Sequence, residues 1–124
     1  MITNKSINFN SYSASWQQNA CAEIISVIRN KDQITYNALA ASANMTGPHK
    51  IHRLTSWLEQ LMAEDHQNDR PFRAAVVISK VRDGLPASGF FDKAKELGLD
   101  FETTDKRASY KAYLQKVYAS ISER

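Results

Sequence analysis

The 124-residue chain contains few of the residues that cross-link or interrupt a fold: one cysteine, four glycines and three prolines. A disulfide needs two cysteines, and a cysteine-based zinc site needs several. Because Cys21 is the single cysteine, the chain can form neither of them internally. The low glycine and proline content argues against a disordered or low-complexity protein. Hydrophobic residues make up 43% of the chain, which is enough for one core in a chain of single-domain size.

Long hydrophobic runs and a strong charge of one sign are also missing. The longest apolar runs, such as Ala74 to Ile78, fall well short of the ~20 residues that span a bilayer. No basic segment followed by an apolar one opens the chain, so we expect no secretory signal, no membrane partner and a cytoplasmic location. The net charge is only +3, which permits DNA binding without requiring it.

The chain carries no recognisable signature of catalysis. Its carboxylates are scattered, and neither a Gly-x-Ser-x-Gly elbow nor a glycine-rich phosphate loop occurs. His49 and His52 have a spacing that two metal ligands can use, but His66 lies more than three turns further on. We therefore expect no enzyme, no cofactor and no metal site. Cys21 is interpreted as a small residue in or beside the core.

The order of the segments predicts a short arm followed by one domain. Residues 1–12 are polar and rich in Asn and Ser, which is typical of a flexible N-terminal arm. Residues 13–124 are predicted to form the domain, with a core and wing at 13–87 and a helical extension at 88–124. No internal repeat and no long linker divides it.

Spacing of apolar residues predicts three helices in the first half of the chain. The first begins near Ser15, which has Gln18 three residues on, the pairing of a capping box. A short second helix follows Thr35, a suitable N-cap residue. The third is expected over 48–66, with Pro48 at its first turn and one stripe of apolar side chains. That stripe contains Ile51, Leu54, Leu58, Leu61 and Met62.

A β-hairpin is predicted after the third helix. The segment 74–81 is apolar at both parities, which suits a buried strand. Asp83-Gly84 is a hairpin turn signal, and residues 85–87 suffice for a short return strand. The expected fold is therefore mainly α with a small β-hairpin: a winged helix-turn-helix-like core plus C-terminal helices.

In such a fold the third helix is free to enter the major groove of double-stranded DNA, with the wing at 80–85 beside it. The predicted contacts are donors to phosphates and base edges, namely His49, Lys50, His52, Arg53, Ser56, Lys80 and Arg82. Acidic residues near the end of the helix would confine the contact to its first half. The alternative interpretation is an ordinary solvated helix face.

Residues 34–98 resemble, loosely, the DNA-binding domain of O6-alkylguanine-DNA alkyltransferases and alkyltransferase-like proteins. The resemblance rests on Ile34 to Ala40, the Gly47-Pro48 turn and the third helix. It places Lys50 near the arginine with which that family fills the space of a flipped base. The family's active-site Pro-Cys-His-Arg segment would fall at Pro71-Phe72-Arg73, where the cysteine and histidine are missing. Phenylalanine cannot replace a thiolate, so alkyl transfer is excluded.

A second resemblance is to small uncharacterised bacterial proteins. It rests on Arg70-Pro71, the apolar segment 74–78, the segment Pro86 to Phe91, and Leu97-Gly98. This resemblance implies a fold and no activity.

A different class of function also fits the chain. A protein-interaction module on the same scaffold would use Phe90 and Phe91, or the C-terminal helix, to bind a protein partner or a second copy as a homodimer. Adjacent helical positions point about 100° apart, so one of the two phenylalanines is expected to be harder to bury. Packing of that second ring against the C-terminal helix is the competing interpretation.

Overall fold

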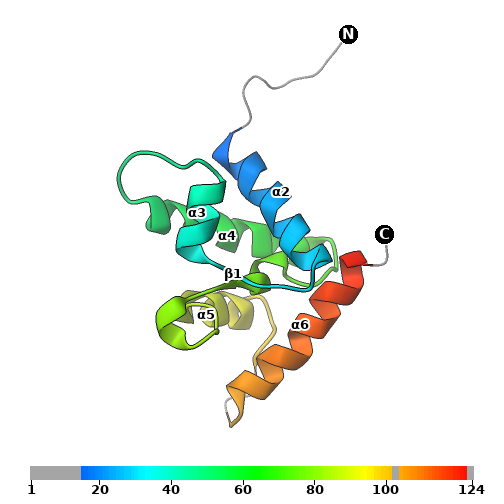
Figure 1. The fold of residues 1–124 in the computed structure, drawn as a ribbon. Coiled ribbons are helices and arrows are strands. Elements are labelled where there is room, and N and C mark those ends of the chain that lie inside the picture. Colours follow the sequence, from blue (N-terminus) through cyan, green and yellow to red (C-terminus); the bar gives the residue numbers. More distant parts are fainter. Residues whose placement is uncertain (1–14, 102–103, 123–124) are drawn as a thin grey trace.

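The structure is a computed structural model, and it describes residues 15–101 and 104–122. That part of the chain is mainly α with one small β element, as the sequence predicts (Figure 1). The predicted arm at 1–12 lies outside the described residues. The elements are α2 (Trp16–Arg29), β1 (Ile34–Thr35), α3 (Tyr36–Ser42), α4 (Lys50–Gln67), the 3-10 helix η1 (Arg73–Val76), β2 (Val77–Ile78), the 3-10 helix η2 (Lys80–Arg82), α5 (Ser88–Glu96) and α6 (Lys106–Ser122).

Both N-terminal caps predicted from the sequence are confirmed. The Ser15 hydroxyl accepts a hydrogen bond from the Gln18 N–H, and the Gln18 side chain accepts one from the Ser15 N–H, each at 3.1 Å. The Thr35 hydroxyl accepts from the Ala38 N–H at 3.1 Å at the start of α3. Each bond satisfies a backbone donor that a helix leaves without an internal partner.

The third helix differs from its prediction at its start and on its apolar stripe. α4 begins at Lys50, because His49 adopts a left-handed backbone conformation (φ 58°) that a helix cannot include. Four residues of the predicted stripe are buried, but Ile51 is 37% exposed. Placing Ile51 in the core is therefore wrong.

The predicted β-hairpin is also wrong. Residues Arg73–Val76 form η1, and only Val77–Ile78 form a strand, which pairs in parallel with β1. Ile34 lies opposite Val77, and Thr35 lies opposite Ile78. A short 3-10 turn buries small apolar side chains on several sides at once, and η1 packs against α2, α4 and α6. The first part of the apolar run is therefore a buried core turn, and only its last two residues are extended.

The predicted wing at 80–85 is a compact turn built on η2. The Leu85 carbonyl accepts from the Ser79 N–H at 2.8 Å, and the Leu85 N–H donates to the Arg82 carbonyl at 3.2 Å. Asp83 and Gly84 both have positive φ (56° and 86°), so they reverse the chain direction. The chain then enters α5, and the described residues contain no return strand at 85–87.

In the described residues, the five α-helices α2 to α6 and η1 contribute to one cluster of buried side chains. Phe90 and Phe91 belong to it, with exposed fractions of 5% and 7%. Phe90 packs on Phe72, and Phe91 packs on Phe101 and on Tyr110 of α6. Because α5 lies between α4 and the segment leading to α6, neighbouring side chains cover both rings. The prediction that the two phenylalanines form a partner-binding surface is therefore wrong.

Among residues 15–101 and 104–122, none of the helices combines the length and apolar character that crossing a bilayer requires.

Asp65 is a fully buried charged residue on α4, and two arginines neutralise it. Its Oδ1 accepts from Arg70 Nε and from Arg73 Nη2, each at 2.7 Å, and its Oδ2 accepts from the Arg73 backbone N–H at 2.9 Å. Burial alone would lower the pKa of the Arg73 guanidinium, but the hydrogen bonds and charge of Asp65 raise it above its ordinary value. This cluster ties η1 to the C-terminal part of α4.

Asp65→Asn removes the charge without changing the shape of the side chain, so the partly buried Arg73 loses its close counter-charge and keeps only the exposed Glu64 at 3.7 Å. We expect the free energy of unfolding to fall by about 3 kcal/mol, because breaking one partner of a buried ion pair leaves an uncompensated charge. Urea-induced unfolding measures it. Glu64→Gln is the matched control: Glu64 also pairs with Arg70 but is 58% exposed, and its loss should cost less than about 1 kcal/mol. Equal losses in the two variants would contradict this account.

Four tyrosines anchor the core through their hydroxyl groups. Tyr110 donates to the Ala75 carbonyl at 2.7 Å and accepts from Gln33 Nε2 at 2.8 Å. Burial raises the pKa of Tyr110 above its ordinary value, and it also raises the pKa values of Tyr36, Tyr113 and Tyr118.

These pKa shifts predict a loss of stability in alkali. An unfolded tyrosine ionises near pH 10, whereas the folded hydroxyls keep their protons to higher pH. The folded state therefore binds more protons above about pH 10, and the free energy of unfolding falls as the pH rises. Tyr110→Phe should weaken that dependence, although it starts from a lower stability at pH 8 because Gln33 and Ala75 lose a partner. Urea unfolding at several pH values between about 8 and 11 tests this; parallel curves for both proteins would refute it.

Candidate nucleic-acid interface

The first turn of α4, the start of α3 and η2 border one surface groove of about 350 Å³. The parallel pairing of β1 with β2 places the residues that follow each strand side by side, and α3 packs on α4. Figure 1 shows α3 and the yellow-green η2 turn on the left of the view, opposite the C-terminal end of α6. The groove is lined by Thr35, Tyr36, Asn37, Ile51, Ile78, Ser79, Lys80 and Val81.

One predicted DNA-binding lysine lines this groove, and a second is the sequence neighbour of a lining residue. Lys80 lines it from η2, and Lys50 is adjacent in sequence to Ile51, which lines it from α4. Both lysines are exposed, and neither forms an ion pair with any residue in the described part of the chain. Their charges are therefore available to an anion. The exposed side chains of His49, His52 and Ser56 continue from the same end of α4.

Arg53 has a structural task at this end of α4. Its Nη1 donates to the carbonyl of Thr46 at 2.8 Å and to that of Pro48 at 2.9 Å. The guanidinium also lies 6.0 Å from the ring centroid of Trp16, and Trp16 stacks edge-on against Trp57 at 5.7 Å. Arg53 therefore holds the loop before α4 in place, and it keeps its full positive charge because carbonyls are neutral.

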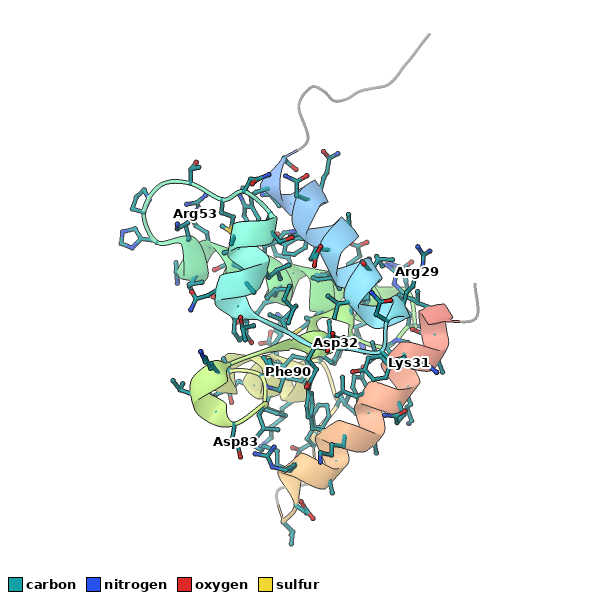
Figure 2. The ribbon with its side chains drawn as sticks, viewed as in Figure 1. Arg29, Lys31, Asp32, Arg53, Asp83 and Phe90 are labelled. Carbon is teal, nitrogen blue, oxygen red and sulfur yellow. The ribbon has the colours of Figure 1, made fainter. Side chains whose placement is uncertain are left out.

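Arg82 is used in a similar way within the η2 turn. Its Nε donates to the Pro86 carbonyl at 3.0 Å. The neighbouring Asp83 accepts from Arg107 at two places, the carbonyl from Nη1 at 2.9 Å and the carboxylate from Nη2 at 3.4 Å. Figure 2 shows Arg53 and Asp83 on one side of the molecule and Arg29 and Lys31 on the other. Arg107 thus ties the η2 turn to the start of α6, while Val81 of η2 stays exposed to solvent.

The sequence missed two apolar residues at the groove. The large hydrophobic side chains exposed in the described residues are Ile51 and Val81, at 37% and 93%. Sequence periodicity assigns Ile51 to the core stripe and places Val81 in a buried strand. A signal for Val81 was available, because it stands between Lys80 and Arg82 just before a turn at Asp83-Gly84.

The histidines and the cysteine do not gather into one cluster in the described residues. No group of three or more His, Cys, Asp or Glu residues within 15–101 and 104–122 is placed to hold a metal ion. Cys21 is half-buried on α2, where its Sγ lies 3.7 Å from Arg73 Nη1.

Comparisons of this chain with protein-family models, with curated proteins and with solved structures found no match.

The contacts of Arg53 predict that it supports the fold more than Lys50 does. Arg53→Ala removes two hydrogen bonds to the loop before α4 and should lower the free energy of unfolding by about 1–2 kcal/mol. Lys50→Ala should change it by no more than about 0.5 kcal/mol, as surface substitutions usually do. Urea unfolding of the two variants makes the comparison. A stability of Arg53→Ala equal to that of Lys50→Ala would show that the loop does not depend on the arginine.

Proposed function

We propose that this protein binds double-stranded DNA without catalysing a reaction on it, through the start of α4 and the η2 turn. The observation that carries the proposal is the groove that α4 and η2 share, with the exposed Lys80 lining it and the exposed Lys50 next in sequence to its lining residue Ile51. Neither lysine pairs with an acid in the described part of the chain. Two cations on separate elements can neutralise phosphates on separate stretches of a DNA backbone. The exposed polar face of α4 then lies against the major groove.

Other features of the interface support the same function. Arg53 and Arg82 donate their hydrogen bonds to neutral backbone carbonyls, and neither pairs with an acid in the described residues, so both add positive charge to this side of the protein. The acidic Glu64 lies more than three turns from Lys50 along α4, and it pairs with Arg70. The resemblance of residues 34–98 to alkyltransferase-like DNA-binding domains agrees with this proposal. It also places Lys50 at the position from which that family reaches the bases.

The protein-interaction alternative has less support. It calls for a broad exposed apolar surface, whereas the exposed large hydrophobic side chains of the described residues are two, both at the groove. Phe90 and Phe91 are buried and cannot provide such a surface.

Fluorescence anisotropy with a labelled random-sequence duplex tests DNA binding. We expect salt-dependent binding, and in Lys50→Ala/Lys80→Ala we expect the slope of log K against log salt to fall by about 2. Arg29→Ala/Lys116→Ala is the matched control, because it removes the same net charge from exposed positions on α2 and α6. The control should retain the wild-type slope.

Two outcomes would overturn the proposal. One is no binding by the wild-type protein at low salt. The other is an equal loss in both double variants, which would mean that only the net charge of the protein matters. Circular dichroism of all three proteins establishes that the variants are folded.

A further inference from the structure

Val81 is the most exposed large hydrophobic side chain in the described part of the chain, at 93%. It is the central residue of η2, and it lines the groove beside Ile78 and across from Ile51. A valine so exposed contributes almost nothing to the core, since the hydrophobic effect rewards only the surface removed from water. Its position calls for an explanation outside the fold.

The turn that carries Val81 is held rigidly. The Arg82 N–H donates to the Ser79 carbonyl at 3.1 Å, and the Ser79 N–H donates to the Leu85 carbonyl at 2.8 Å. Arg107 fixes the far side of the turn through the Asp83 carbonyl at 2.9 Å. Valine also has few rotamers to lose. A partner that buries Val81 therefore pays little conformational entropy, which is the advantage of a preorganised contact.

The charges around Val81 match an anionic partner. Lys80 and Arg82 flank it in the chain. The nearest acid in sequence, Asp83, is paired with Arg107 at 3.4 Å, so its charge is partly offset. An exposed apolar side chain next to an exposed lysine fits a DNA groove, where phosphates border stacked bases.

We propose that Val81 is a wedge that inserts between base pairs from the minor groove, and that the preferred ligand is duplex DNA with weakened stacking. The inference rests on the DNA binding proposed above. Lys80 contacts the phosphate backbone, Arg82 adds positive charge to the turn, and the valine methyl groups replace a base-stacking contact. Unstacking costs least where a base is unpaired or bulged, so such sites bind most tightly. A single apolar residue is too small a surface to anchor a protein in a lipid interface.

The experiment compares three proteins on two duplexes of one sequence, one fully paired and one with a single bulged nucleotide. A 2-aminopurine base beside the bulge reports unstacking by its fluorescence, and anisotropy reports affinity. The wild-type protein should prefer the bulged duplex by about tenfold and raise the fluorescence. Val81→Thr keeps the size of the side chain but adds a hydroxyl, and it should abolish both effects while binding the paired duplex within about twofold of wild type. Val81→Ile should retain both effects.

The outcomes separate this inference from the proposed function. Salt-dependent binding of both duplexes with no preference, or a preference unchanged in Val81→Thr, overturns the wedge and leaves DNA binding intact. No binding to either duplex overturns DNA binding and the wedge together. Binding to vesicles containing anionic lipid that is lost in Val81→Thr, without any preference for the bulge, assigns Val81 to a lipid surface and also overturns the wedge.

Discussion

The buried carboxylate of Asp65 is the constraint on which the arrangement of the second half of the chain depends. A buried charge is tolerated only when it is paired and hydrogen-bonded, and Asp65 meets that demand with Arg70 and with both the side chain and the backbone of Arg73. Residues 70–73 are therefore fixed against α4, and η1 starts from there into the core. Because β2 follows η1 directly, the same cluster determines where β1 finds its partner and where η2 emerges.

The position of β2 after η1 explains how the groove forms without a β-hairpin. The two-residue parallel pairing of β1 with β2 brings Tyr36 and Ser79 to the same groove wall, although they are distant in sequence. The Tyr36 hydroxyl then accepts from the Ala87 N–H at 3.0 Å, which fixes the chain after the η2 turn. A short turn closed by Ser79 and Leu85 thus takes the place beside α4 that the sequence assigns to a wing.

Local signals in the sequence predicted the helices well, and signals that depend on tertiary contacts failed. Ser15 with Gln18, and Thr35, act within three residues, so the caps follow from the sequence alone. The run from Ala74 to Ile78 is apolar at every position, and such a pattern does not distinguish a buried strand from a buried turn. The sequence does not distinguish Asp65 from its exposed neighbour Glu64, since only the fold shows that Arg73 returns to it. The exposure of Val81 also depends on tertiary contacts. The composition of segment 74–81 predicts a buried strand, but in the described residues Val81 lies in η2 and no strand covers it.

The arginines and lysines near the groove differ in their contacts, and this difference bears on the kind of DNA recognition proposed above. Arginine forms planar, directed hydrogen bonds, whereas lysine is a flexible point charge. Five arginines donate hydrogen bonds to a carboxylate or a backbone carbonyl: Arg53, Arg70, Arg73, Arg82 and Arg107. In the described residues, Lys80 at the groove and Lys50 beside its lining residue Ile51 form no ion pair. Bidentate reading of guanine is chiefly the task of arginine, and Arg53 and Arg82 already donate to backbone carbonyls. For the DNA binding proposed above, we therefore expect phosphate contact through lysine to dominate, and recognition to depend on DNA shape and deformability more than on base sequence.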